Sequence, residues 1–390
     1  RLIYSYTLRD QPATLLAGVR YYRGETVTRQ GDGSDGDDAD FEFADDSQPE
    51  DSDFRFPSQN ISVFAENVFP IGPRFSITPG ARLESIQTQA EGYFNQRVFD
   101  AAGNLVASTR QEDSLERNRL LLLLGVGLSY KSPFGLEFYA NITQNYRAIN
   151  FSDIRVVNPN FQVDPAIQDE RGYTADLGFR GELFKDRFYL DVTAFYMRYN
   201  DRIGLLLLAD SVPPFATFRY RTNIADSRTW GLEMLAEAEL WRKQDGSQSL
   251  SALLNLAVIH ARYINTDDPT IVDKEVELVP PLNLRASLRY RWQNLNLSFQ
   301  VSHVQQHFSD ATNSESSPSA VVGLIPTYTV LDLSASYTWR FLTFSLSANN
   351  LTNASYFTRR AESYPGPGII PSDPIGVFGT LRLHWPEAGR

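Results

Sequence analysis

Hydrophobic and polar residues alternate with a period of two along several long segments of the chain. The clearest are residues 282–292, 294–303, 330–340 and 342–349. In residues 342–349, Leu, Phe, Leu and Ala alternate with Thr, Ser, Ser and Asn. Because successive side chains of a β-strand point to opposite faces, this period predicts strands with one apolar face and one polar face.

The length of the alternating segments favours strands that cross a membrane. They run for roughly 10–14 residues, whereas strands of soluble proteins average about 5–6. The longest strongly apolar stretch, residues 120–128, is about half of the roughly 20 residues that a membrane-spanning helix needs. We therefore predict that strands, and not helices, span the bilayer.

Short and long connections take turns along the chain. The short ones are predicted near residues 10–13, 70–74, 131–134, 184–186, 243–248, 291–294 and 340–341. The long ones are predicted near residues 25–57, 94–116, 150–168, 204–216, 265–280, 309–325 and 355–375. Outer-membrane barrels place short turns in the periplasm and long loops outside the cell. Residues 1–390 are thus predicted to form one all-β domain, an antiparallel transmembrane β-barrel with about 15 strands.

Composition agrees with a barrel and excludes several other classes of protein. Aromatic residues make up 13% of the chain, cysteine is absent, and the formal net charge is -11. The absence of cysteine excludes a disulfide framework, and the acidic balance argues against a nucleic-acid partner. Aromatic side chains also gather at the short-turn ends of the strands, as in a girdle at the membrane boundary. These residues are Tyr130, Trp241, Trp292, Trp339 and Trp385.

The number of strands predicts that the barrel extends beyond this sequence. The first strand (residues 2–8) and the last (residues 376–385) are predicted to run in the same direction. That gives an odd count, whereas bacterial single-chain barrels have even counts, so we expect further strands before Arg1 and about 22 in total. Barrels of that size are the plugged transporters, and the plug is absent from this chain.

Six phrases resemble one family. They are residues 62–69 (SVFAENVF), 77–86 (ITPGARLESI), 145–155 (NYRAINFSDIR), 169–181 (DERGYTADLGFRG), 221–233 (RTNIADSRTWGLE) and 349–360 (NNLTNASYFTRR). They are similar to TonB-dependent outer-membrane receptors, especially the ferric-dicitrate-receptor-like branch. The resemblance runs along nearly the whole chain and implies a plugged barrel in the outer membrane of a Gram-negative bacterium, in contact with lipid and lipopolysaccharide.

The resemblance also implies what the full-length protein does. It implies uptake of a scarce iron chelate, with energy from the TonB complex, which pulls on a short motif ahead of the plug. This sequence lacks the plug and that motif, so partner contacts with TonB are expected through the missing amino-terminal segment. It also continues as residues 386–390 after Trp385, whereas the family usually ends on an aromatic residue that the assembly machinery reads.

A ferric-citrate-like ligand is anionic, so its site is expected to hold arginines at the outer ends of strands or in long loops. A guanidinium can pair with a carboxylate through two parallel hydrogen bonds. The candidate ligand-binding residues are Arg147, Arg155, Arg219, Arg221, Arg359 and Arg360. The alternative for each is a structural ion pair with a neighbouring carboxylate.

Other polar clusters predict no catalytic or metal site. Residues 32–53 contain 11 carboxylates, but their spacing does not match a calcium-binding EF-hand loop, so a solvated loop is the simpler interpretation. His303 and His307 share one strand face, about 13 Å apart along an extended strand, which is too far for one metal ion. Because hydrolase and nucleotide motifs are also absent, we expect neither an enzyme nor a resident cofactor.

The leading hypothesis is therefore a TonB-energised importer of a ferric-citrate-like chelate. One alternative is an importer of the same family for another siderophore, cobalamin or a glycan. Two further alternatives are a passive porin or fatty-acid channel of about 14–16 strands and an outer-membrane protease or lipase. The six phrases argue against the channel, and the lack of a convincing acid–base pair argues against the enzyme.

Overall fold

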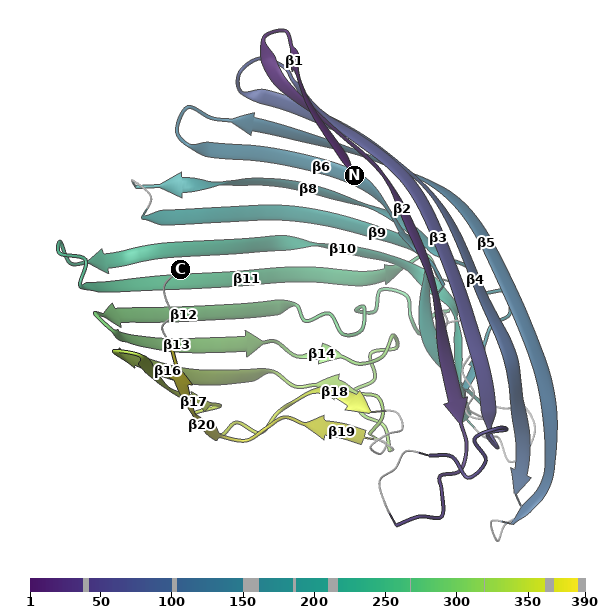
Figure 1. Cartoon of the computed structure of the whole chain (residues 1–390). Coiled ribbons are helices and arrows are strands. Elements are labelled where there is room, and N and C mark those ends of the chain that lie inside the picture. The colour runs from purple at the N-terminus through teal and green to yellow at the C-terminus, as the bar shows by residue number, and fades with distance from the viewer. Residues whose placement is uncertain are drawn as a thin grey trace. The chain divides into compact units, whose positions relative to one another are not determined.

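The structure is a computed structural model that describes residues 1–37, 42–99, 104–149, 161–184, 187–209, 217–266, 268–318, 320–361 and 368–384. Every helix or strand assigned in this part of the chain is a β-strand (Figure 1). Within the same residues, no helix is long and apolar enough to cross a membrane.

The strands are long and follow one another closely along the chain. They are β1 (Leu2–Leu8), β2 (Gln11–Gln30), β3 (Ser52–Pro70), β4 (Phe75–Phe99), β5 (Leu105–Lys131), β6 (Leu136–Arg147), β7 (Phe161–Val163), β8 (Glu170–Leu183), β9 (Phe188–Ala209), β10 (Thr217–Arg242), β11 (Gln248–Ile264), β12 (Leu282–Trp292), β13 (Leu295–Val304), β14 (His307–Phe308), β15 (Leu324–Ile325), β16 (Tyr328–Trp339), β17 (Leu342–Asn349), β18 (Phe357–Ala361), β19 (Gly368–Pro371) and β20 (Gly376–Leu383).

One sheet contains 16 of these strands. Its path is β1-β2-β3-β4-β5-β6-β8-β9-β10-β11-β12-β13-β16-β17-β20, and β7 pairs with β10 beside that path. Most neighbours on the path follow each other in the chain, as in a meander of hairpins, and short strands intervene only between β6 and β8, β13 and β16, and β17 and β20. The β7–β10 pair is parallel. The short strands β14–β15 and β18–β19 form two separate two-stranded sheets. The prediction of about 15 long antiparallel strands agrees with this order.

The chain divides into two compact units. Unit 1 comprises Arg1–Val126, Thr143–Gly172 and Tyr199–Ile224, and unit 2 comprises Gly127–Ile142, Tyr173–Arg198 and Ala225–Arg390.

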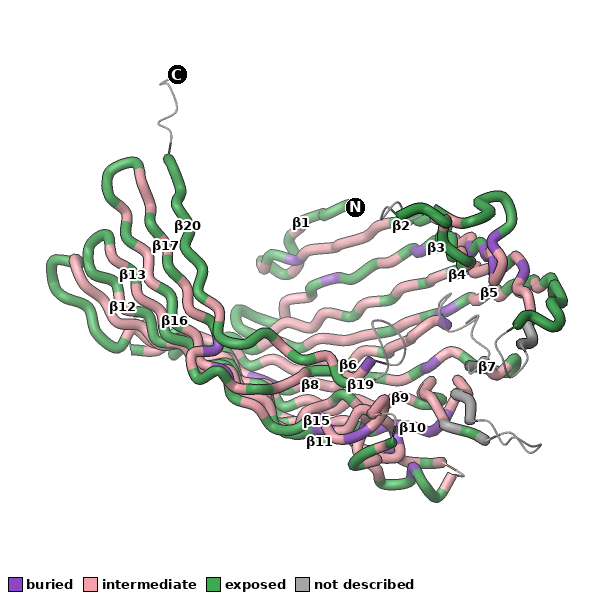
Figure 2. The backbone as a smooth tube through the Cα atoms, turned by 90° about the horizontal axis from the view of Figure 1, so that it is seen from below, coloured by how far each residue is buried: buried purple, intermediate pink, exposed green. Residues whose placement is uncertain are grey.

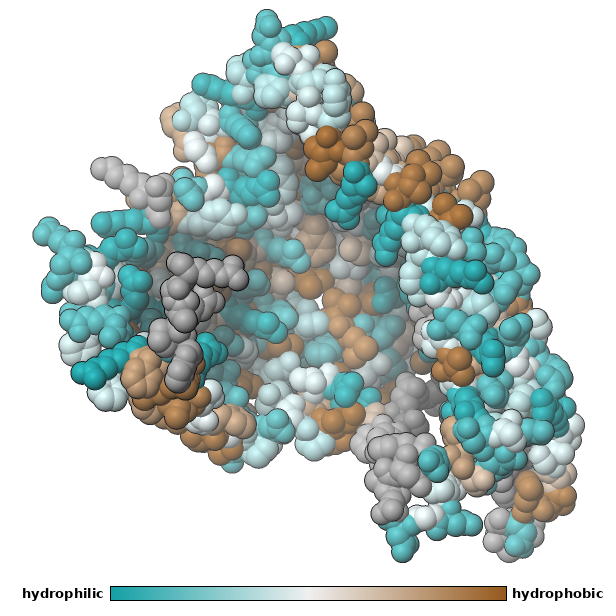
Figure 3. Space-filling model, viewed as in Figure 1, coloured by the Kyte–Doolittle hydropathy of each residue, from teal (hydrophilic) through white to brown (hydrophobic). Residues whose placement is uncertain are grey.

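The strands expose large apolar side chains on one face. On β5, Leu120, Leu122 and Leu124 are 73%, 58% and 49% exposed. The intervening positions of β5 are half-buried or buried, so exposure alternates along the strand (Figure 2). Hydrophobic side chains are correspondingly visible at the molecular surface (Figure 3). Large apolar side chains exposed in this way are unfavourable in water and suit contact with membrane hydrocarbon.

Unit 1 has a small hydrophobic core outside the apolar face. Phe54 and Phe56 of β3 pack there with Ala90 of β4, and with Ile149 and Ile167 from the connection between β6 and β8. All five side chains are less than one-tenth exposed. This core holds the chain around Ile167 against the sheet. It thereby positions the polar residues that are next to Ile167 in the sequence.

In unit 2, the long connections after β11 and β13 contain buried apolar side chains and are joined by hydrogen bonds. Tyr263 at the end of β11 is fully buried, as are Ile271 and Ile325 in the two following connections. The Asn313 side chain accepts a hydrogen bond from the Glu275 N–H (2.7 Å) and donates one to the Glu275 carbonyl (2.8 Å). The connections β11–β12 and β13–β16 therefore form one packed layer.

Six of the seven predicted long loops contain strand residues, and their bounds need correction. The loop predicted at 150–168 contains β7, the loop at 309–325 contains β15, and the loop at 355–375 contains β18 and β19. Residues 94–116 were predicted as loop, but β4 continues to Phe99 and β5 begins at Leu105. Likewise, β2 and β3 extend into residues 25–57, and β9 occupies residues 204–209 of the loop predicted at 204–216. Beyond the membrane both faces of a strand can meet water, so pairing continues after the apolar alternation has stopped.

Candidate functional site

A cavity of about 670 Å³ lies on the polar face of unit 2. We call it the loop-side cavity, because the connection between β17 and β20 forms one of its walls. Its polar lining residues are Ser298, Gln300, Asp332, Ser334, Asn349, Asn350, Tyr356, Ser372 and Asp373.

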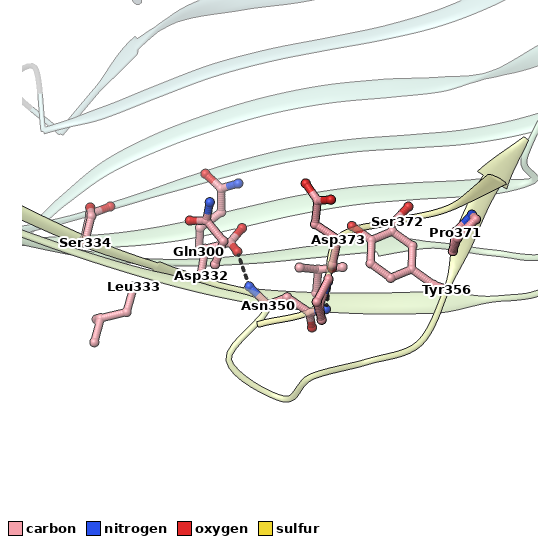
Figure 4. A pocket seen from close by; sticks show the side chains of 13 residues that line it. Gln300, Asp332, Leu333, Ser334, Asn350, Tyr356, Pro371, Ser372 and Asp373 are labelled. Carbon is pink, nitrogen blue, oxygen red and sulfur yellow. Dashed lines mark hydrogen bonds between the residues drawn. The ribbon is translucent and has the colours of Figure 1, made fainter. Parts of the chain in front are cut away.

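The sheet wall of the cavity follows from the strand register. Gln300 of β13 pairs with Asp332 of β16, and Ser298 pairs with Ser334. These four residues belong to the polar set of their strands. In the close view, Gln300 and Asp332 lie on one side of the strand, and Leu333 points to the other (Figure 4). Alternation along two paired strands is therefore enough to bring these polar side chains together.

Asn350 shapes the opposite wall. It follows β17 directly, is only 3% exposed, and has a positive φ of 51°. Its N–H donates to Asp332 Oδ1 (2.9 Å), and its side-chain amide donates to the carbonyls of Ala354 (2.9 Å) and Asp373 (3.2 Å). Asn tolerates the left-handed region better than most residues, which fits its place at this sharp turn. Asn350 thus joins the sheet to both ends of the loop.

The chemistry of the cavity is that of hydroxyl and amide groups with two carboxylates. Tyr356 enters it from the loop and stacks on Tyr328, with ring centroids 4.7 Å apart. No Arg, Lys or His is among the described residues that line it. Such a site can hydrogen-bond a hydroxyl-rich or cationic group, whereas the carboxylates of Asp332 and Asp373 would repel a free polycarboxylate.

Arg360, one of the predicted ligand-binding residues, holds two loops of unit 2 together. Its guanidinium donates to the carbonyls of Ala320 (2.7 Å) and Leu324 (2.8 Å). It also lies over the Phe357 ring, 5.2 Å from the ring centroid. These contacts give Arg360 a structural role, and the neighbouring Arg359 is exposed on β18.

Arg147, the strongest sequence candidate, lies at the end of β6 in unit 1. Its Nη1 donates to Glu170 Oε1 (2.7 Å), and the same carboxylate oxygen accepts from the Ile203 N–H (3.0 Å). Glu170 is buried, whereas the side chain of Arg147 is 39% exposed. The ion pair was the alternative anticipated from the sequence, and the exposed part of Arg147 can still be reached from solvent.

A second and more deeply buried ion pair holds the connection between β6 and β8. Arg119 Nε donates to Asp169 Oδ2 (2.7 Å), and Asp169 Oδ1 accepts from the Ile149 N–H (2.9 Å). The hydroxyl of Tyr146 also donates to this carboxylate. Burial by itself would raise the pKa of Asp169, but these donors outweigh it and hold the pKa below its usual value. Nothing in the sequence pattern indicates that Arg119 and Asp169 meet, because 50 residues separate them.

Two further predicted arginines of unit 1 lie in β10, where it pairs with β7. The backbones of Arg219 and Arg221 pair with Phe161 and Val163 in the parallel β7–β10 ladder. The side chain of Arg219 and the whole of Arg155 lie outside the described residues. Of the predicted set, Arg147, Arg155, Arg219 and Arg221 belong to unit 1, and Arg359 and Arg360 belong to unit 2.

The acidic segment after β2 is partly held by one arginine. Arg29 Nη1 contacts Asp46 Oδ1 (2.9 Å), and Arg29 Nε lies 3.6 Å from Asp53 Oδ2. The side-chain and backbone donors of Ser47 hold the pKa of the Asp45 carboxyl below its usual value. Among the residues with described positions, no three His, Cys, Asp or Glu side chains gather as metal ligands would. Residues 38–41 of this segment lie outside the description.

Sequence comparison identifies a family for most of the chain. The model of the family described as TonB dependent receptor-like, beta-barrel, matches residues 2–351. No curated protein matches the sequence.

Solved structures share the fold at low sequence identity. The ferric-catecholate import receptor Fiu from E. coli K12, in its closed form, has a TM-score of 0.73 at 13% identity, covering 98% of this chain and 53% of that one. The unliganded ferric citrate transporter FecA gives 0.69 at 17%, with coverages of 98% and 53%. The copper transporter OprC gives 0.67 at 18%, with coverages of 98% and 57%. This chain thus spans about half the length of those proteins, and the likeness confirms the predicted all-β antiparallel barrel fold.

Proposed function

Because the chain belongs to the TonB dependent receptor-like β-barrel family, we propose that it is the barrel portion of an outer-membrane importer of a ferric chelate. The first candidate cargo is a ferric-citrate-like siderophore. TonB supplies the energy in the full-length protein, through a segment outside this sequence. The chelate is cargo, and neither a resident cofactor nor catalysis forms part of the proposal.

One observation carries the proposal beyond family membership. The polar face of unit 2 ends, on the side of the long connections, in a cavity whose volume of about 670 Å³ falls within the usual range for small-molecule sites. Hydrogen bonds of Asn350 and Arg360 hold the connections around it. A preformed cavity next to long loops suits capture of a small ligand from outside the cell.

Two classes of cargo fit different parts of the structure. The exposed part of Arg147 supports an anionic chelate such as ferric citrate. The lining of the loop-side cavity, with Asp332 and Asp373 and no cationic side chain, favours an uncharged chelate rich in hydroxyl groups. The second class is the alternative within the same importer function.

The membrane setting supports the same function. The exposed leucines of β5 suit lipid hydrocarbon, and membership of the family supports a location in the outer membrane of a Gram-negative bacterium. Lipid and lipopolysaccharide are then its surroundings, and the chelate and TonB are its specific partners.

Calorimetry on the full-length protein in detergent tests the cargo. Ferric citrate, iron-free citrate and a ferric hydroxamate siderophore would be titrated separately. Heat of binding with ferric citrate alone supports the anionic chelate. Heat with the hydroxamate alone supports the uncharged class, and no heat with any of them contradicts both candidate cargoes.

Substitution of Arg147 tests its role as a ligand contact. Arg147→Ala is expected to weaken ferric citrate binding about tenfold, the loss of roughly one charge-assisted hydrogen bond. Arg171→Ala is the matched control, because Arg171 is an exposed arginine beside Glu170 on the opposite face of β8. Equal affinities of wild type and Arg147→Ala would remove Arg147 from the site and leave it with Glu170 as a structural pair.

A further inference from the structure

Two arginines stand directly opposite each other where β10 pairs with β11 (Figure 1). Arg228 and Arg262 are register partners in this antiparallel ladder. Side chains opposite each other on one face have Cβ atoms about 4.5–5.5 Å apart, and like charges in such a pair destabilise the sheet. An anion between the two guanidinium groups relieves this repulsion. The arginine pair therefore indicates an anionic partner.

The arginine pair lies on the apolar face of unit 2. Towards the short turn, the residues of β10 on the same face as Arg228 are Trp230, Leu232, Met234, Ala236, Ala238 and Leu240. Leu232 and its partner Val258 on β11 are 39% and 47% exposed. The two cations thus stand at the end of a band of apolar side chains that suits lipid hydrocarbon.

Aromatic residues mark both ends of this apolar band. Trp230 is 49% exposed, and its ring lies against that of its partner His260, with centroids 5.1 Å apart. At the other end, Trp241 is 45% exposed. The strand between the two tryptophans rises by about 36 Å, or about 28 Å across a membrane at a tilt of about 40°. A barrel presents an apolar band of about 25 Å to the bilayer, so Trp230 and His260 lie at one membrane–water boundary.

The boundary next to the arginine pair is the outer one. β11 ends at Ile264, two residues after Arg262, and the long connection to β12 follows. At the opposite end of the two strands, the short turn of residues 243–247 joins β10 to β11. Barrels place short turns in the periplasm and long connections outside the cell. The arginine pair therefore faces the headgroups of the outer leaflet.

Arg228 is the cation that is available to a ligand. It is exposed, and it makes no hydrogen bond or ion pair within the part of the chain that the structure describes. The carboxylates nearby are engaged elsewhere. Asp226 accepts a hydrogen bond from Arg198 Nη2 (3.1 Å). Glu275 Oε1 lies 3.6 Å from Arg262 Nη2. The repulsion at the arginine pair is thus only partly offset by the protein's own carboxylates.

From this arrangement, we propose that Arg228 and Arg262 bind a phosphate group of lipid A, the phosphorylated glycolipid part of lipopolysaccharide. Guanidinium groups bind phosphate through paired, charge-assisted hydrogen bonds. The acyl chains of the lipid lie along the apolar face beside Leu232 and Val258, and Trp230 lies at the level where acyl chains meet sugar. The inference rests on the proposed outer-membrane location and is independent of the cargo.

Native mass spectrometry of the full-length protein in detergent tests the site. Lipid A with both phosphates, the same lipid A after removal of its phosphates, and phosphatidylglycerol would be titrated separately. Lipid A with both phosphates is expected to bind at least tenfold more tightly than the other two. Arg228→Gln should weaken its binding about tenfold, the loss of roughly one charge-assisted hydrogen bond. Arg289→Gln is the matched control and should leave the affinity unchanged, because Arg289 is an exposed arginine on the polar face of β12.

A stability measurement separates a lipid site from a structural role. In vesicles of zwitterionic phospholipid, Arg228→Gln removes the like-charge repulsion, so its urea unfolding midpoint should equal or exceed that of wild type. In vesicles that also contain lipid A, the order should reverse, because a ligand stabilises the protein that binds it more tightly. If Arg228→Gln were less stable than wild type by the same amount in both vesicles, Arg228 would have a structural role, and the site would be overturned.

The remaining outcomes also decide the question. If wild type binds phosphatidylglycerol as tightly as lipid A, the surface takes any anionic headgroup, and the assignment to lipid A is wrong. Equal binding of lipid A with and without phosphates would overturn the role of phosphate. If the wild-type protein inserts into vesicles and shows no preference for lipid A, only the site fails. If it does not insert at all, the proposed membrane location fails, and the site fails with it.

Discussion

At the residue scale, the stability of the β6–β8 connection depends on a buried ion pair. The Arg119 side chain is 7% exposed and the Asp169 side chain 14% exposed. Asp169→Ala removes the carboxylate and leaves a buried guanidinium without its partner, which is expected to cost about 3–5 kcal/mol. Urea unfolding of the full-length protein in lipid vesicles measures this loss. Glu112→Ala is the control, because Glu112 pairs with Arg110 in an exposed bridge worth about 0–1 kcal/mol.

The same carboxylate predicts the pH dependence of the anchor. Since the pKa of Asp169 is lower in the folded protein, its contribution is complete above the unfolded value of about 3.9 and disappears as the pH falls through the folded value. Asp169→Asn should therefore reduce the change in stability below about pH 4. The anchor model would be wrong if wild type and Asp169→Asn lost stability in parallel on acidification.

At the element scale, Gly92 determines how closely β3 and β4 approach. It pairs with Phe54 and has a φ of +157°. A Cβ at this position would clash with the Asp53 carbonyl oxygen and lie 2.8 Å from the Phe54 Cα. Gly92→Ala is expected to cost about 1–3 kcal/mol through backbone strain, measured by urea unfolding. Gly379→Ala should be nearly neutral, because a Cβ there meets nothing within 4 Å. Equal losses in the two variants would contradict a specific role for Gly92.

Strands were predictable from sequence wherever one face is apolar. The strands predicted at residues 2–8, 282–292 and 342–349 occur as β1, β12 and β17. The first part of β5, residues 105–116, was predicted as loop because polar residues on both faces erase the period of two. The candidate functional site was harder to predict from the sequence. Alternation places Gln300 and Asp332 on the polar face, but only the folded loop brings Asp373 and Tyr356 to them.

At the scale of the whole molecule, the apolar face must match the bilayer. Leu122 lies in the apolar band of β5 and is 58% exposed. Leu122→Arg is expected to destabilise the protein in a bilayer by about 2–4 kcal/mol if this position lies near the midplane. Asn118 lies on the same face of β5, closer to the start of the strand. Asn118→Arg should cost about 0–1 kcal/mol, because the membrane–water interface tolerates charge. Urea unfolding in vesicles compares the two variants. A soluble sheet would show no difference between them, since both positions would face water, so the depth dependence separates a membrane-spanning face from an exposed one.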